Sequence, residues 1–240
     1  MSANTGIEQP NGEPESRRGV LIWVIKTIVG ILFTAAILFV SAGRLDWVMG
    51  WVYLGIFVGV TAVTPLTTDP ELLIEERGVG KEDSKRWDRR LVGLYGLVSL
   101  PIPLIIAGLD LRFGWFPQIG LGLQIGALVL YLLAWGMHIW AMATNKFFSK
   151  VIRIQKDRGH TVITGGPYRY VRHPGYVGAI VISLATPLIL GSLWALIPGT
   201  LGALLIIIRT ALEDKTLQEE LEGYKEYTEQ VHCRLLPGVW

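Results

Sequence analysis

The chain has 240 residues, of which 51% are hydrophobic and 18% are charged, and its formal net charge at pH 7 is only +2. Such a small net charge gives no support to a nucleic-acid-binding protein. A single cysteine, Cys233, excludes an internal disulfide and a cysteine-rich metal site. Apolar residues gather in runs of about 20, long enough to cross a bilayer, so the sequence predicts an all-α, polytopic integral membrane protein.

The first 19 residues are polar and include Pro10, Gly12 and Pro14, which predicts a disordered N-terminal tail over residues 1–19. No small-residue cleavage site follows the first apolar run, so we interpret this run as a retained helix and not as a signal peptide. Four transmembrane helices are expected within residues 20–144, at 20–42, 47–66, 91–109 and 119–144. Because the third contains Pro101 and Pro103, it is expected to be kinked.

A further stretch, from 177 to 208, contains no charged residue. As one helix, its roughly 32 residues would be about 48 Å long, whereas a bilayer core is about 30 Å thick. Gly191 and Ser192 lie near its middle and can form a turn. We therefore predict a hairpin of two helices, at about 177–190 and 193–212, which brings the total to about six transmembrane helices.

The distribution of positive charge predicts the orientation in the membrane. Residues 1–19, 67–90, 145–176 and the tail from Arg209 together contain 19 Lys or Arg residues, whereas the connections on the opposite side contain Arg44 and Arg112. Cytoplasmic loops carry such an excess, so both termini are expected to be cytoplasmic. A five-span arrangement would move the C-terminal tail outside and weaken this pattern.

Two pairs of glycines, Gly55/Gly59 and Gly122/Gly126, have the small-xxx-small spacing that favours close helix packing in lipid. The glycines from Gly120 to Gly126 do not form a dinucleotide fingerprint, because their spacing is wrong and no predicted strand precedes them.

The segment 145–176 is the most informative for chemistry, and residues 159–176 read GHTVITGGPYRYVRHPGY. Its glycines and prolines indicate a compact, irregular backbone against the membrane. His173 precedes Pro174 and is therefore disfavoured in helical geometry, which places its imidazole at the mouth of the next helix. Arg209 and Glu213 are four residues apart on one face of the last apolar helix, where a charge is costly unless it is used or paired.

Simpler interpretations exist for each of these features. Arginines could anchor the chain to anionic lipid, tyrosines could form an interfacial aromatic belt, and Arg209 and Glu213 could form an ordinary helix salt bridge. Their combination with the Gly- and Pro-rich loop favours a functional site.

Several motifs together resemble the isoprenylcysteine carboxyl methyltransferase family. They are GPYRYVRHPGY at 166–176, Arg-x-x-x-Glu at 209–213, and Tyr224-x-x-Tyr227 followed by the ending RLLPGVW at 234–240. The resemblance covers residues 145–240, and the sequences at 145–149 and 85–88 more weakly resemble bacterial members. The Arg-His-Pro-x-Tyr signature is shared with related membrane methyltransferases that act on phospholipid amines, so it defines the cofactor better than the substrate.

The resemblance implies that residues 145–240 form a methyltransferase region containing the membrane hairpin, with S-adenosyl-L-methionine as the methyl donor. It implies a catalytic role for Arg209, which would hold the acceptor carboxylate, and it places Glu213 at the cationic end of the cofactor. The other implied cofactor-binding residues are Gln155, His160, Thr161, Val162, Ile163, Tyr168, His173, Pro174, Gly175 and Tyr176.

The implied chemistry needs no catalytic triad or metal, because a carboxylate acceptor is already ionised at pH 7. The expected acceptor is the carboxylate of a prenylcysteine-like, lipophilic substrate that enters from the membrane lipid. A phospholipid or other small-lipid methyltransferase is an alternative, as is an NADPH-dependent reductase of sterol-like lipids. A transporter is less favoured, because the expected spans contain only two charged residues, Lys26 and Arg209, each near the end of its span.

Overall fold

The computed structural model describes residues 13–67, 85–117 and 119–240, and within these ranges it contains helices and turns but no strand. The predicted all-α fold is thereby confirmed. The helices, in chain order, are α1 (Glu13–Ala42), α2 (Val48–Thr67), α4 (Arg86–Ser99), α5 (Pro101–Phe113), α6 (Leu121–Thr144), α7 (Pro174–Ile189), α8 (Leu196–Glu220) and α9 (Tyr224–Gln230). Two short 3-10 helices, Lys156–Arg158 and Gly166–Arg169, lie between α6 and α7.

Five helical stretches of the described chain are long and apolar enough to cross a membrane: Val24–Ala42, Val48–Thr67, Arg86–Phe113, Leu121–Thr144 and Leu196–Glu220. Their outer faces carry large apolar side chains such as Val40, Leu66 and Ile197, which are 74%, 83% and 63% exposed. Such a surface is unfavourable in water and suits a lipid environment. The fold is therefore that of a polytopic membrane protein.

The predicted C-terminal hairpin is present, but its two arms differ in length. α7 and α8 are joined by a turn in which Gly191 has a φ of +81°. The 16 residues of α7 span only about 24 Å, so α7 is apolar but shorter than the five spans. α8 continues to Glu220, so Arg209 and Glu213 lie within a long helix and not at its exit.

The predicted kink in the third span is confirmed as a break between α4 and α5. At the break, Leu100 has φ −124° and ψ −76°, which is outside helical geometry. Pro101 explains this conformation, because a proline disfavours the α region for the residue before it and has no N–H to donate.

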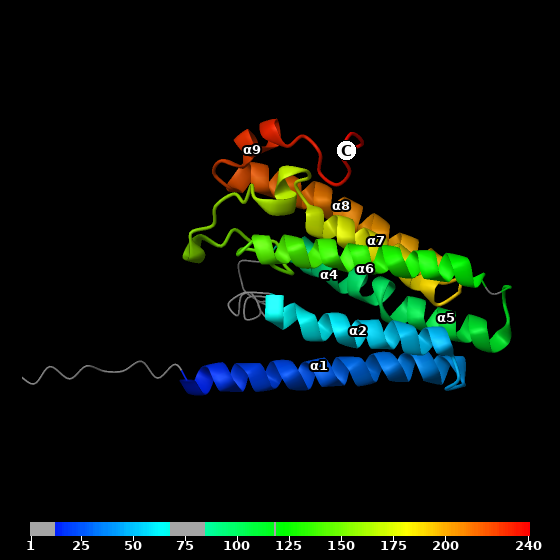
Figure 1. The fold of residues 1–240 in the computed structure, drawn as a ribbon. Helices are drawn as coiled ribbons and strands as arrows, with labels where there is room; N and C mark the ends of the chain where they lie inside the picture. The colour runs from blue at the N-terminus through cyan, green and yellow to red at the C-terminus, as the bar shows by residue number, and fades with distance from the viewer. Residues whose placement is uncertain (1–12, 68–84, 118) are drawn as a thin grey trace, which may run out of the picture.

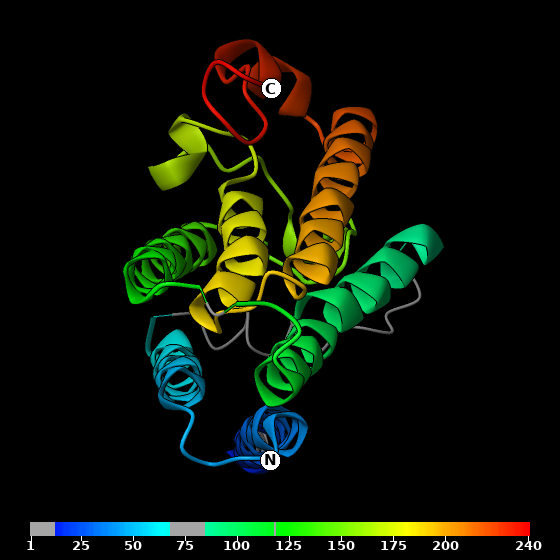
Figure 2. The ribbon, with the colours of Figure 1, turned by 90° about the vertical axis from the view of Figure 1, so that its right-hand side faces the viewer.

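The helices form a bundle whose centre is α7, which packs against both α6 and α8 (Figure 2). Glycines allow this close approach: a Cβ atom added at Gly178 would lie 2.7 Å from the carbonyl oxygen of Ala134, and one at Gly199 would lie 2.5 Å from that of Ser183. The prediction of close packing at Gly55/Gly59 and Gly122/Gly126 is wrong for contacts within the described part of this chain, where nothing lies within 4 Å of a Cβ added at any of them. Their spacing places each pair on one face, but the other helices pack against different faces.

Residues 13–19 are helical, although the sequence predicted a tail over 1–19; residues 1–12 lie outside the described ranges. Glu13 and Pro14 are both favourable in the first turn of a helix, which explains the earlier start.

Figure 1 shows that the start of α1, the segment between α6 and α7, and α9 lie at one end of the bundle, with the α1–α2, α5–α6 and α7–α8 connections at the other. Part of the basic segment 67–90 also lies outside the described ranges.

Candidate active site

The segment 145–173 folds back against the end of α6 through a small set of polar contacts. Asn145 accepts a hydrogen bond from the backbone N–H of Phe147 (2.9 Å) and donates one to the hydroxyl of Tyr168 (3.2 Å). Gly166 has a φ of +54°, and a Cβ atom there would lie 2.7 Å from Oγ1 of Thr144. Glycine is therefore required at this position for the chain to return to α6.

Gln155 holds the same segment from behind. Its side chain is 1% exposed, donates to the carbonyl oxygen of Phe147 (2.7 Å) and accepts from Nη1 of Arg158 (2.7 Å). Gln155 therefore braces the wall of the site from within the protein, and its side chain does not face the space that the sequence predicted it to line.

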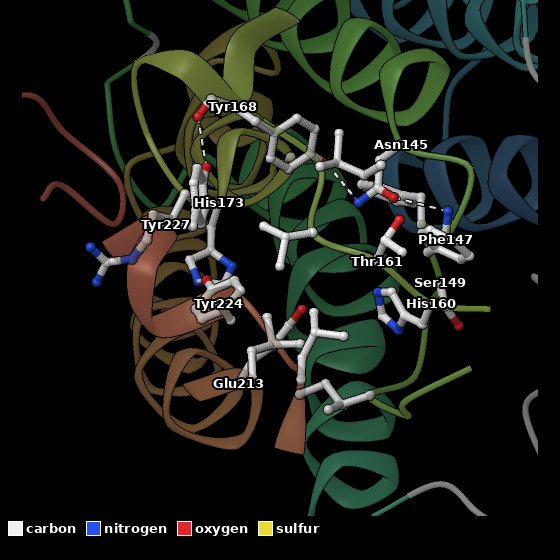
Figure 3. Close-up of a pocket in the computed structure, with 18 of the residues that line it drawn as sticks. Asn145, Phe147, Ser149, His160, Thr161, Tyr168, His173, Glu213, Tyr224 and Tyr227 are labelled. Carbon is white, nitrogen blue, oxygen red and sulfur yellow. Dashed lines mark hydrogen bonds between the residues drawn. The ribbon is translucent and has the colours of Figure 1, made fainter. Parts of the chain in front are cut away.

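A pocket of about 810 Å³, open mouth included, lies between this segment, the start of α7 and the end of α8 (Figure 3). The lining residues are Asn145, Phe147, Phe148, Ser149, Val151, Ile152, Arg153, His160, Thr161, Val162, Ile163, Tyr168, Arg172, His173, Gly175, Tyr176, Glu213, Leu217, Leu221, Tyr224 and Tyr227.

The structure brings most of the predicted site residues together around this pocket. Those in the lining are His160, Thr161, Val162, Ile163, Tyr168, His173, Gly175, Tyr176 and Glu213. Gln155, Pro174 and Arg209 lie outside the lining. Pro174 is the first residue of α7, and a glycine follows it because a Cβ atom at Gly175 would lie 2.9 Å from the ring of Phe148.

Tyr176 connects the pocket with Arg209. Its ring stacks on that of His173, with centroids 5.7 Å apart, and its hydroxyl donates a hydrogen bond to the carboxylate of Glu213. The guanidinium carbon of Arg209 lies 5.2 Å from the centroid of the same ring. Arg209 is thus adjacent to the pocket but in contact with Tyr176, which lines it.

Asp214 forms the centre of a second group of contacts, which the sequence analysis did not identify. Its fully buried carboxylate accepts hydrogen bonds from Arg172 (2.8 and 3.0 Å) and Arg234 (2.8 Å). It also contacts His173 (3.2 Å) and Tyr224 (3.1 Å). Arg172 in turn donates to the backbone of the C-terminal segment, at the carbonyl oxygens of Val231 and His232. Asp214 therefore holds the C-terminal segment against the start of α7, beside the pocket.

No spacing rule links Asp214 to Arg172, because Arg172 is 42 residues away in the sequence. The sequence offered one indication: Asp214 follows Glu213 in a largely apolar helix, and a charged residue there is costly unless it is paired.

The partner of Arg209 was also missed. Arg209 is 7% exposed and donates through Nε (2.7 Å) and Nη2 (3.2 Å) to the carboxylate of Asp88, which is fully buried at the start of α4. Nη2 also donates to the carbonyl oxygen of Lys150 (2.7 Å). The sequence at 85–88 was noted only as a weak resemblance, and the pair spans 121 residues.

Titratable groups around the pocket are adjusted by burial. Burial, aided by the nearby charges of Arg153 and Arg158, lowers the pKa of His160 to about 4. This ring accepts a hydrogen bond from the backbone N–H of Gln155 at Nδ1 (3.3 Å), which fits a neutral imidazole at pH 7. Burial also raises the pKa of Tyr168, Tyr224 and Tyr227 above the ordinary value of a phenol, so these hydroxyls remain neutral donors.

Comparison with known proteins matches the part of the chain that contains most of this pocket's lining. The model of the isoprenylcysteine carboxyl methyltransferase (ICMT) family matches residues 127–219, which contain most of α6, the segment between α6 and α7, the whole of α7 and nearly all of α8. The resemblance seen in the sequence is thereby confirmed over these residues.

Individual relatives have matching names. Two proteins of rice, Oryza sativa subsp. indica and subsp. japonica, are each named "Probable protein-S-isoprenylcysteine O-methyltransferase" and are 29% identical over 129 residues, which are 52% of this chain and 64% of theirs. A protein of Schizosaccharomyces pombe named "Protein-S-isoprenylcysteine O-methyltransferase" is 40% identical over 45 residues, or 19% of each chain. The chain thus spans less than two thirds of the rice relatives' length.

Proposed function

We propose that this protein is a membrane methyltransferase that uses S-adenosyl-L-methionine to methylate the carboxylate of a prenylcysteine-like, lipophilic acceptor. The observation that carries the proposal is a pocket at one end of an apolar helix bundle, lined mostly by residues of the family-matched region. The names of the rice and yeast relatives favour the carboxylate as the methylated group.

The composition of the pocket fits the proposed cofactor. S-adenosyl-L-methionine has an apolar purine face, an amino-acid group and a cationic sulfur, and when bound it supplies a methyl group on that sulfur. Val162, Ile163 and Leu217 offer apolar surface, whereas Glu213 offers a carboxylate that favours a cation. Because Glu213 is bonded to Tyr176, its carboxylate has a fixed direction.

The residues around the pocket bind and orient, and they need not move a proton. A carboxylate acceptor is already ionised at pH 7, so no general base is required. Alignment of the reacting atoms and exclusion of water can then provide much of the rate enhancement. Arg209 would hold the acceptor oxygen from its place beside the ring of Tyr176, which accounts for its position next to the pocket and outside its lining.

The acceptor would reach this end of the bundle laterally from the bilayer, since the surrounding helix faces are apolar. The excess of Lys and Arg in the segments expected at this end supports a cytoplasmic location for the pocket and for both termini. A cytoplasmic pocket would have direct access to the soluble cofactor.

The test is calorimetric titration of the detergent-purified protein with S-adenosylhomocysteine, with NADPH titrated in parallel. We expect saturable binding of S-adenosylhomocysteine alone. Radiolabelled methyl transfer to an S-farnesylcysteine derivative with a blocked amine then tests the acceptor, and the corresponding methyl ester is its control. Binding of NADPH alone would instead favour a lipid reductase, and transfer to a phospholipid amine but not to the carboxylate would contradict the proposed acceptor.

A further inference from the structure

Asp88 lies outside residues 127–219, yet it contacts residues of the site and beside it. It is in the first turn of α4, its side chain is fully buried, and its carboxylate pairs with Arg209 of α8. Oδ2 of the same carboxylate accepts the backbone N–H of Ile152 at 2.7 Å. Ile152 lines the pocket, so one carboxylate joins α4, α8 and the pocket wall.

The pairing fixes the orientation of the guanidinium of Arg209. Nε and Nη2 both point to Asp88, and Nη2 also donates to Lys150, so one edge of the planar group is fully used. Nη1 makes no hydrogen bond with any residue of the described ranges. Since a guanidinium presents its five N–H donors in a rigid fork, fixing one edge fixes the direction of the other.

We propose that Asp88 is a positioning residue for methyl transfer: it orients Arg209 so that the Nη1 edge is the donor that receives the acceptor. This inference rests on the proposed function, and it adds a residue from the N-terminal half of the bundle to the site. It also explains why an aspartate is buried there. The carboxylate neutralises Arg209, so the acceptor meets a directed hydrogen-bond donor within a paired, neutral group.

The chain offers a matched control in Asp110, a second buried aspartate of the same span. Asp110 is 1% exposed and accepts hydrogen bonds from Ser192 (2.6 Å) and the backbone N–H of Phe116 (3.1 Å). It lies in the last turn of α5, and α5 ends at the end of the bundle opposite α9 (Figure 1). Asp110→Asn and Asp88→Asn therefore make the same isosteric change in comparable burial, but only Asp88 contacts Arg209.

The experiment compares methyl transfer to the S-farnesylcysteine derivative with S-adenosylhomocysteine binding, in the full-length protein and both variants. For Asp88→Asn we expect kcat/KM for the acceptor to fall at least tenfold, while the Kd for S-adenosylhomocysteine changes less than twofold. Asp88→Glu should recover part of the lost activity, and Asp110→Asn should keep wild-type kinetics. Normal transfer by Asp88→Asn, or an equal loss of transfer and cofactor binding, would overturn the inference.

A double-mutant cycle tests whether Asp88 acts through Arg209. In an Arg209→Gln background, the further change Asp88→Asn should leave the residual kcat/KM unchanged, and an undiminished loss would overturn the inference. If Asp88→Asn does not fold, Asp88→Glu is measured in its place. Its longer side chain should shift Arg209 and lower kcat/KM for the acceptor, while cofactor binding stays intact. Wild-type kinetics in Asp88→Glu would overturn the inference. A wild-type protein that binds S-adenosylhomocysteine but transfers to no carboxylate would overturn the proposed acceptor first, and with it this inference.

Discussion

Two buried arginine–aspartate pairs flank the pocket, and they differ in how many groups share the carboxylate. Asp214 accepts from two arginines, a tyrosine and a glutamine and contacts a histidine, whereas Asp88 accepts from one arginine and one backbone N–H. Both carboxylates are fully buried. The Asp214 group joins chain segments, and hydrogen bonds engage all three nitrogens of Arg172, whereas the Asp88 pair leaves the Nη1 edge of Arg209 without a partner among the described residues. The Asp214 group therefore suits a structural role, and the Asp88–Arg209 pair suits the binding of a ligand.

The largest expected effect comes from breaking the Asp214 group. In Asp214→Ala, Arg172 and Arg234 lose their common partner, and removing one member of a buried ion pair typically costs about 3–5 kcal/mol. We expect the free energy of unfolding to fall by about that amount, with loss of S-adenosylhomocysteine binding. Denaturation with sodium dodecyl sulfate in mixed micelles, followed by tryptophan fluorescence, measures the first quantity.

The control for that change lies on the same helix. Lys215 and Glu219 form an exposed pair at 3.8 Å, and such pairs contribute about 0–1 kcal/mol. Glu219→Gln should therefore leave stability almost unchanged. Similar denaturation midpoints for Asp214→Ala and Glu219→Gln would mean that the Asp214 group is not structural.

The next largest effect is expected on turnover, and it should differ between Arg209 and Arg172. Arg209→Ala should lower the turnover of a carboxylate acceptor by about 10²-fold, the size of loss seen when a positioned donor is removed, while cofactor binding is retained. Arg172→Ala should lower both, because Arg172 lines the pocket and anchors the C-terminal segment. Turnover and calorimetric Kd are measured on the same preparations. Unchanged turnover in Arg209→Ala would mean that the acceptor is not anionic or that Arg209 has only a structural role.

The sequence predicted the features that depend on neighbouring residues, but not the contacts between distant ones. Hydrophobic run length and Pro101 were sufficient for the five long spans and for the break at Leu100, because both depend on local properties of the chain. Lining residues were predictable where they are contiguous, as in 160–163. Asp88 and Asp214 were not assigned a role, because their contacts bridge 121 and 42 residues and arise only when the helices pack.

The glycines illustrate the same limit. The small-xxx-small pattern was recognised at Gly55/Gly59 and Gly122/Gly126, yet the close contacts occur at Gly178 and Gly199. A spacing of four residues specifies a helix face, but only the packing of other helices decides whether that face is covered. The same argument applies to Gln155, whose residue type suits a pocket while its side chain braces the wall from behind.

A smaller effect is expected at Glu213, which lies between the two pairs on α8. Glu213→Gln removes a negative charge from the pocket, and we expect cofactor affinity to fall about tenfold, equivalent to about 1.4 kcal/mol. Calorimetry with both S-adenosylmethionine and S-adenosylhomocysteine identifies the recognised cation: a larger loss for the first indicates the sulfonium, and equal losses indicate the amino group. The exposed Glu222→Gln is the control, and an unchanged Kd in Glu213→Gln would remove its assignment to the cofactor.

The smallest expected effect is a change in the pH dependence of stability at His160, which lines the pocket and belongs to neither pair. Its pKa is about 4 in the folded protein against 6.5 for an unperturbed histidine. As the pH falls from 6.5 towards 4, the unfolded chain binds a proton at His160 before the folded chain does, so the folded state loses stability over this window. His160→Gln should therefore show a shallower loss of stability between pH 6.5 and 4.5, measured by the same denaturation assay. His232→Gln, which removes an exposed imidazole, is the matched control, and identical slopes for wild type and His160→Gln would show that burial does not hold this ring neutral.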